Sequence, residues 1–309
     1  MKEGATRDAY GQALVEMGND QRIVVLDAGV SDSSRSKKFG DKYPERFFNV
    51  GIAEADMVCT AAGLATTGKI AFATGFACFL LGRTMDQILV SVAYSNTNVK
   101  LVGTHTGLAV GEDGPTAQMI VDIAYMRALP NMIVVQPADW EETVQATRAL
   151  AEYEGPAYFR LGRPKVKGIF DSSYKFEIGK GMVVKKGSDL VIFATGIMVQ
   201  ESLTAMEILE KDGINVTLVN ISTIKPIDRD IIIEMASSHK AVITAEDYNY
   251  IGGLGDAVGE VLLDAQISKP FKRIAVKDHF AETGTGQELF EKYGLSANHI
   301  TKAVRDSLK

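Results

Sequence analysis

Short apolar runs rich in β-branched residues alternate with longer stretches of helical periodicity through the first half of the chain. Continuous apolar runs of this length are typical of parallel strands buried on both faces of a sheet. The expected strands are Arg22 to Asp27, Lys69 to Thr74, Val99 to Thr104, Met132 to Gln136 and Ala157 to Leu161. The expected helices are Thr6 to Met17, Glu54 to Ala65, Arg83 to Tyr94, Thr116 to Ala128 and Trp140 to Tyr153. This alternation predicts a doubly wound α/β domain over residues 1–168.

The alternation stops in a basic, glycine-containing segment and begins again at Asp189. We therefore expect a linker over residues 169–186 and a second, smaller doubly wound α/β domain over residues 187–309. Its expected strands are Asp189 to Gly196, Val216 to Val219, Ala241 to Ala245 and Arg273 to Val276. Its expected helices are Met198 to Lys211, Asp228 to Ser237 and Gly255 to Ala265. A length of 309 residues suits two domains of this kind.

Charge and composition exclude several classes of function. The net charge is -6 and no long Lys/Arg run occurs, so the chain lacks the electrostatic footprint of a nucleic-acid-binding protein or a general membrane binder. The charged start and the absence of a long apolar run predict a cytoplasmic protein. Cys59 and Cys78 have no metal-ligand spacing and are expected to be small core residues on buried helices.

Several polar or aromatic side chains follow predicted strands, where ligands of open α/β sheets bind. Glu54 begins a helix after Gly51, although a carboxylate there also suits the helix dipole. Phe76 and Phe79 share a helical face at a spacing of three, as a core pair also would. His105 ends a strand and Asp113 follows in a glycine-rich loop, so both can reach one crevice, although a lone histidine is more often structural.

Two arginines, Arg7 and Arg163, lie near the beginning and the end of the first predicted domain. Either could be a solvated surface charge, or both could grip an anion, because a guanidinium offers planar paired donors. The segment from Gly252 to Gly259 has imperfect spacing for a dinucleotide fingerprint and is expected to be a loop and helix start. The remaining histidines are too scattered to predict a metal site: His239, His279 and His299.

Six segments, in this order, resemble the pyrimidine-binding and C-terminal domains of the transketolase family over nearly the whole chain. They are Ala5-Thr6-Arg7, Gly51-Ile52-Ala53-Glu54, Gly75-Phe76-Ala77-Cys78-Phe79, Thr104-His105, Gly111-Glu112-Asp113-Gly114-Pro115-Thr116 and Arg160-Leu161-Gly162-Arg163-Pro164. The resemblance implies thiamine diphosphate as cofactor, with Mg²⁺ or Ca²⁺, and transfer of a two-carbon ketol unit between sugar phosphates.

The resemblance also implies roles at the cofactor. Glu54 would be the acid that faces the aminopyrimidine ring, and Phe76 and Phe79 would pack on that ring. Where some transketolases have a third aromatic residue, this chain has Gly82.

For the substrate, the resemblance implies that His105 and Asp113 orient a ketose donor. Arg7 and Arg163 would hold the terminal phosphate of the sugar, with a contribution from the Ser33 hydroxyl. Some family members carry a second histidine after the Gly-Pro-Thr sequence, and here that position is Ala117.

The family's Gly-Asp-Gly segment, which binds the metal and the diphosphate, does not occur in these 309 residues. The resemblance therefore implies the C-terminal subunit of a transketolase divided between two polypeptides. An N-terminal subunit would carry the diphosphate and metal site, and self-association would give an α2β2 assembly that serves the pentose phosphate pathway or a specialised sugar pathway. Two alternatives stay open: the beta subunit of a 2-oxo acid dehydrogenase, and a non-catalytic regulatory subunit.

Overall fold

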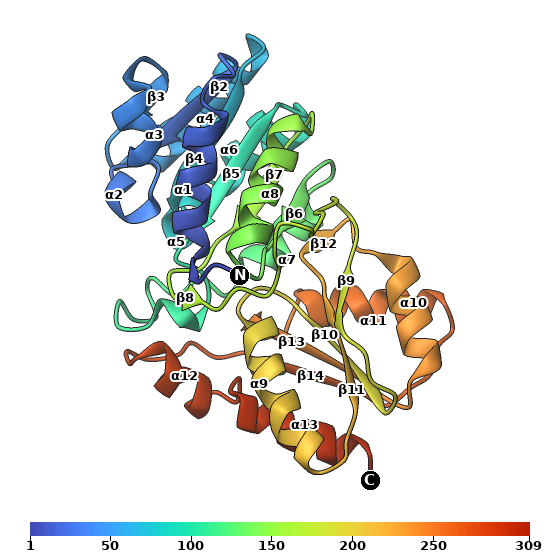
Figure 1. The fold of residues 1–309 in the computed structure, drawn as a ribbon. Coiled ribbons are helices and arrows are strands. Elements are labelled where there is room, and N and C mark those ends of the chain that lie inside the picture. The colour runs from blue at the N-terminus through green and yellow to red at the C-terminus, as the bar shows by residue number, and fades with distance from the viewer.

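The computed structural model describes all residues from Met1 to Lys309. The first domain is built on a seven-stranded sheet (Figure 1). The strand order is β12-β6-β7-β5-β4-β2-β3, and only the edge strand β12 is antiparallel to its neighbour. The strands are β2 (Ile23–Asp27), β3 (Phe47–Asn49), β4 (Ile70–Phe76), β5 (Val99–Thr104), β6 (Ile133–Val135), β7 (Ala157–Arg160) and β12 (Thr223–Lys225). All five strands predicted in this domain are present.

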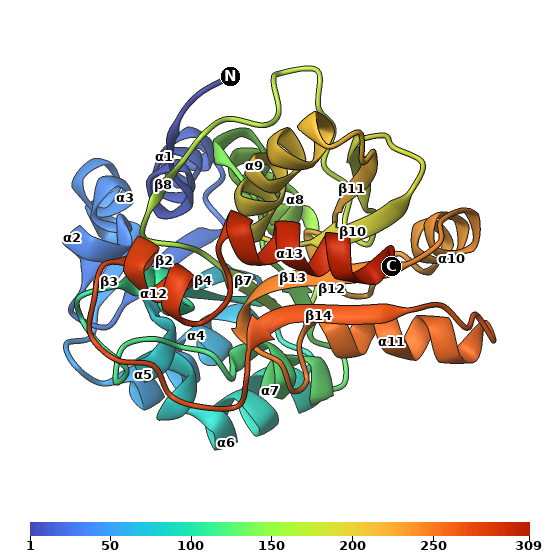
Figure 2. The ribbon, with the colours of Figure 1, turned by 90° about the horizontal axis from the view of Figure 1, so that it is seen from below.

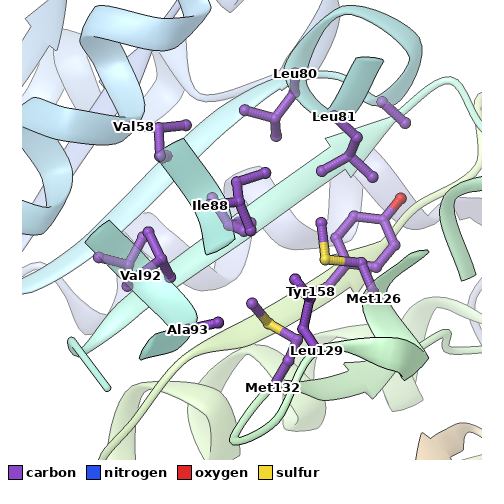
Figure 3. Packing of buried hydrophobic residues seen from close by; sticks show 14 of the residues in the cluster. Val58, Leu80, Leu81, Ile88, Val92, Ala93, Met126, Leu129, Met132 and Tyr158 are labelled. Carbon is purple, nitrogen blue, oxygen red and sulfur yellow. The ribbon is translucent and has the colours of Figure 1, made fainter. Parts of the chain in front are cut away.

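Helices cover both faces of this sheet, which is the doubly wound arrangement predicted from the sequence. One face carries α1 (Thr6–Met17), α3 (Lys37–Lys42) and α8 (Trp140–Glu152). The other carries α4 (Glu54–Thr66), α5 (Ala77–Gly82), the π-helical segment η2 (Ile88–Tyr94) and α7 (Asp122–Ala128). Figure 3 shows the core on the second face, where Val58, Leu80 and Met126 from three helices pack above the sheet.

Two predicted helices are shorter or less regular than expected. The predicted helix over Arg83–Tyr94 is a short α6 (Met85–Gln87) followed by η2. The predicted helix over Thr116–Ala128 begins only at Asp122, because the backbone of residues 106–119 is engaged elsewhere: Gly107 N–H donates to the Met119 carbonyl at 2.8 Å. The expectation that Cys59 is buried was wrong. It lies on the outer face of α4 because its neighbour Val58 points into the core.

The second domain has a five-stranded sheet in the order β14-β13-β10-β11-β9, with β9 as its antiparallel edge (Figure 2). The strands are β9 (Met182–Lys185), β10 (Leu190–Ala194), β11 (Val216–Asn220), β13 (Val242–Asn249) and β14 (Phe271–Val276). Helices α9 (Met198–Lys211) and α13 (Ala297–Ser307) cover one face, and α10 (Arg229–Ser238) and α11 (Leu254–Asp264) cover the other. The segment expected as a linker thus contributes β9 to this sheet.

Two short strands complete the first domain. The strand β1 (Gly4–Ala5) pairs with β8 (Lys165–Val166), so the chain start is fastened to the end of the first domain. The strand β12 comes from the second half of the chain but completes the first sheet. The remaining short elements are α2 (Ser31–Ser34), η1 (Pro44–Arg46), η3 (Leu108–Val110) and α12 (Gly286–Lys292). None of the helices has the length and apolar character needed to cross a bilayer.

Candidate active site

The carboxyl ends of β4 and β5 bring an aromatic side chain and a histidine together. Phe76, the last residue of β4, pairs in register with Thr104, the last residue of β5. His105 follows directly, and its ring centroid lies 3.8 Å from that of Phe76. Phe79, in the first turn of α5, stacks with Phe76 at a centroid distance of 6.0 Å. Both phenylalanines are half-buried, so they form an aromatic wall at the edge of the sheet where ligands of open α/β folds bind.

Glu54 begins α4 beside this wall, and its side chain is only 6% exposed. Both of its oxygens accept hydrogen bonds from Nη1 of Arg83 at 3.0 Å. The guanidinium of Arg83 also lies over the Phe79 ring, 4.5 Å from its centroid. An acid, an arginine and two stacked rings therefore form one continuous group.

The hydrogen bonds of His105 fix its protonation. Arg7 Nη1 lies 3.0 Å from Nε2, and because a guanidinium only donates, Nε2 must accept. Nδ1 then carries the proton and donates to the Thr104 hydroxyl at 2.9 Å, while that hydroxyl donates to the Gly75 carbonyl at 3.3 Å. Burial, followed by the positive charges of Arg7 and Arg163, lowers the pKa of His105 to about 3. The imidazole is therefore neutral near pH 7.

Arg7, near the start of α1, joins two of the predicted site residues. Its Nη1 donates to the Ser33 carbonyl at 2.9 Å as well as to His105. Ser33 makes this contact through its backbone carbonyl, whereas the role expected for its hydroxyl is at the sugar phosphate. The Nε atom of Arg7 is buried without a hydrogen-bond partner. Burial and the nearby Arg35 lower the pKa of Arg7, because both disfavour its positive charge. A bound anion would offset that cost, so the guanidinium is suited to bind one.

Arg163 lies beside the glycine-rich loop. Its Nη1 donates to the Val110 carbonyl at 2.6 Å, and it lies 3.8 Å from the Asp113 carboxylate. Arg163 and Arg7 line the same open cleft, which has a volume of about 310 Å³. The sequence predicted these two arginines from opposite ends of the first domain, and the fold places them together.

Sequence reasoning missed three cationic residues of this site. Arg35 and Lys165 line the cleft with Arg7 and Arg163, and Arg35 also forms an ion pair with Asp8 at 2.7 Å. Arg83 is the third, and its position four residues after Phe79 is the spacing at which two side chains meet along a helical turn.

The two positions where the chain departs from the family pattern differ in exposure. Gly82 is exposed, and an added Cβ there would meet nothing within 4 Å. Ala117 is buried, at 7% exposed.

The residues present suit the pyrimidine half of thiamine diphosphate. Glu54 supplies a buried carboxylate, and Phe76 with Phe79 supplies a flat apolar wall beside it. An aminopyrimidine ring has an apolar face and a ring nitrogen that can bond to a carboxyl group, so both features match. The chain contains no group of three or more His, Cys, Asp or Glu side chains that could hold a metal ion.

Comparison with known proteins places both domains in one family pattern. Residues 2–168 match the transketolase pyrimidine-binding domain and residues 179–300 match the transketolase C-terminal domain. The chain is 46% identical over 98% of its length to a Methanocaldococcus jannaschii protein named "Putative transketolase C-terminal section", covering 96% of it. It is 39% identical to a 6-deoxy-6-sulfo-D-fructose transketolase subunit of Clostridium sp., over 99% of this chain and 95% of that protein. A solved structure described as a split gene transketolase, inactive β4 tetramer, superposes with a TM-score of 0.91 at 46% identity and covers 98% of both chains.

Proposed function

Because the chain belongs to the transketolase family, we propose that it is one subunit of a thiamine diphosphate-dependent transketolase that moves a two-carbon ketol unit from a ketose phosphate to an aldose phosphate. The observation that carries this proposal is the arrangement along one sheet edge. Arg83 joins the Glu54 carboxylate to the Phe79 ring, and Phe79 stacks on Phe76, which packs on His105. His105 in turn accepts a hydrogen bond from Arg7, which lines the cleft with Arg163.

At the cofactor, Glu54 would bond to the aminopyrimidine nitrogen, and Phe76 and Phe79 would cover the ring face. Thiamine diphosphate, when bound, supplies the carbon nucleophile of ketol transfer. Arg83 holds the Glu54 carboxylate between its two 3.0 Å contacts and so keeps that side chain at the ring edge. A carboxyl group in this position would share a proton with the aminopyrimidine nitrogen.

At the substrate, the cleft lined by Arg7 and Arg163 would hold the phosphate of the sugar. A phosphate would draw Arg7 away from His105 and leave Nε2 free to accept a hydrogen bond from a donor hydroxyl. Asp113, beside Arg163, would accept from a hydroxyl further along the sugar. By its name, the Clostridium relative acts on a sulfonated sugar. The feature that such a sugar shares with a sugar phosphate is an anionic group at the end of the sugar's carbon chain.

A partner subunit would complete the site. The comparisons that support this are the relative named as a C-terminal section and the split-gene structure whose β4 tetramer is described as inactive. The partner would be an N-terminal transketolase subunit that holds the diphosphate and Mg²⁺ or Ca²⁺. Self-association of this chain would then give an α2β2 assembly.

The test is reconstitution with a transketolase N-terminal subunit. The two chains are co-purified, and ketol transfer from xylulose 5-phosphate to ribose 5-phosphate is assayed with thiamine diphosphate and Mg²⁺. Activity is expected in the mixture and in neither chain alone. A stable complex that binds the cofactor but transfers no ketol unit from any phosphorylated or sulfonated ketose would overturn the proposal.

A further inference from the structure

We propose that Asp247, a residue of the second domain, is a positioning residue for the donor-binding loop of the first domain. The donor-binding loop is residues 105–113, which begin with His105 and end with Asp113. Asp247 lies near the end of β13 and contributes no atom to the cleft lined by Arg7 and Arg163. The inference rests on the proposed function, because it takes these loop residues as the donor site.

Asp247 holds the middle of the loop with both carboxylate oxygens. Oδ1 accepts from the Leu108 backbone N–H at 2.7 Å, and Oδ2 accepts from the Ala109 N–H at 3.1 Å. These are the first two amides of η3, which lack partners within that short helix. The Asp247 side chain is 2% exposed, so the carboxylate cannot exchange these bonds for water without opening the domain contact.

The loop is shaped to receive this carboxylate. Gly107 has a φ of +71°, and a Cβ added there would lie 2.1 Å from Oδ2 of Asp247. The carboxylate therefore occupies the space that a side chain at position 107 would need. His105, two residues earlier, also has a positive φ, of +58°. A non-glycine residue in this conformation is strained and persists only when its surroundings hold it.

Hydrogen bonds to the backbone of β13 hold Asp247 in place. Arg160 is fully buried at the end of β7, and its Nη2 donates to the Asp247 carbonyl at 3.2 Å and to the Met119 carbonyl at 3.1 Å. Its Nε donates to Asp122 at 2.7 Å. Asn249, two residues after Asp247, donates its N–H to the Ile120 carbonyl at 3.1 Å. The strand end is thus bonded to residues 119–122, the segment that follows the loop, and displacement of Asp247 would loosen that segment.

The chain offers a matched control in the neighbouring residue. Glu246 is equally buried, and it also accepts two backbone N–H bonds, from Leu254 at 2.6 Å and Gly255 at 2.8 Å. Those amides begin α11 in the same domain, so Glu246 has no contact with the donor-binding loop. The variants D247N and E246Q therefore each replace one buried carboxyl group by an amide at adjacent positions, and only D247N reaches the loop.

The first test is kinetic and uses the complex with the N-terminal subunit. In D247N, the amide group cannot accept from both N–H groups, so one is left without a partner. We expect the KM for the ketose phosphate donor to rise about tenfold, with little change in the Kd for thiamine diphosphate, because Glu54 lies outside the loop. E246Q should keep the wild-type donor KM. Equal donor KM values in D247N and E246Q would overturn the inference.

The second test is hydrogen exchange of the loop amides in the same complex, which does not depend on turnover. Exchange at Leu108 and Ala109 should rise at least about tenfold in D247N and stay unchanged in E246Q. If the wild-type complex transfers no ketol unit, the proposed function fails, and this exchange experiment still decides whether Asp247 orders the loop. Wild-type protection of these amides in D247N would overturn the inference.

A second pair of variants approaches the contact from the loop side and serves if D247N does not fold. G107A adds a Cβ against Asp247 at a φ of +71°, whereas G213A adds one at a φ of +75° with nothing within 4 Å. The two positions share a positive φ, but Gly107 also has a ψ of -172°, a combination that glycine alone adopts readily, so G107A adds backbone strain as well as the clash with Asp247. The donor KM should rise in G107A and not in G213A, and equal values in these two variants would contradict the role of the Asp247 contact.

Discussion

Arg83 binds both carboxylate oxygens of Glu54 through a single nitrogen, at 3.0 Å each, while its guanidinium covers the Phe79 ring. The Arg83 side chain is 50% exposed and that of Glu54 is 6% exposed, so the buried acid obtains its charge partner from the surface. The pair thus links the aromatic wall to the carboxylate, and each member can be tested separately.

The first prediction concerns the Glu54 carboxylate. E54Q keeps the shape of the side chain but removes the acid that would bond to the aminopyrimidine ring. We expect ketol transfer by the complex with the N-terminal subunit to fall by at least about 100-fold. D56N is the control, because Asp56 lies in the same first turn of α4 and is exposed. An E54Q complex with full activity would remove this chain from the chemistry.

The second prediction concerns the stability of the free chain. R83A leaves the buried Glu54 carboxylate without its charge partner, and the free energy of unfolding in urea should fall by about 1–2 kcal/mol. R22A is the control, since the pair between Arg22 and Asp20 lies at the surface and such pairs contribute little. If both variants unfold at the same urea concentration, the ion pair between Arg83 and Glu54 contributes no more to the free energy of unfolding than the surface pair does.

The local part of the candidate site could be predicted from the sequence, and the distant part could not. Phe76 and Phe79 were expected on one helical face, and their rings do stack, but across the junction between β4, which Phe76 ends, and α5, which holds Phe79. The contact between Arg7 and His105 joins α1 to the end of β5, and no local pattern encodes it. Asp247 was missed for the same reason, because β13 reaches the first domain only through the domain arrangement.

For the fold as well, local features could be predicted from the sequence and features that depend on distant contacts could not. Buried parallel strands such as β4 and β5 are continuous apolar runs, and they were predicted almost to the residue. The helix expected over Thr116–Ala128 was too long because its first turn is replaced by loop contacts, including the backbone bridge between Thr106 and Met119. The edge strand β9 was missed because an edge strand needs no buried apolar face on both sides.

The third prediction concerns the cleft lined by Arg7 and Arg163. R163A removes a guanidinium that we propose binds the terminal phosphate, so the KM for a phosphorylated donor should rise more than kcat falls. A donor that lacks the phosphate should keep its KM, which is measured in the same assay. R148A is the matched control, because Arg148 forms a surface ion pair with Glu16 on α1 and lies outside the cleft. Equal losses with both donors would show that Arg163 acts on the fold and not on the phosphate.

The fourth prediction concerns the protonation of His105. Its pKa is lowered from 6.5 to about 3, so the folded protein binds this proton less readily than the unfolded chain does. The contribution of His105 should therefore reduce the free energy of unfolding as the pH falls from 6.5 towards 3, and have no effect above that window.

In NMR spectra of chain labelled at its four histidines, the His105 ring signals should not titrate between pH 5 and 8, with H105N used for assignment. The R7M variant should raise the His105 pKa, because Arg7 is the largest of the charges that lower it. A His105 ring that titrates near 6.5 in the wild-type chain would contradict the donor arrangement of Arg7 and the assigned tautomer together.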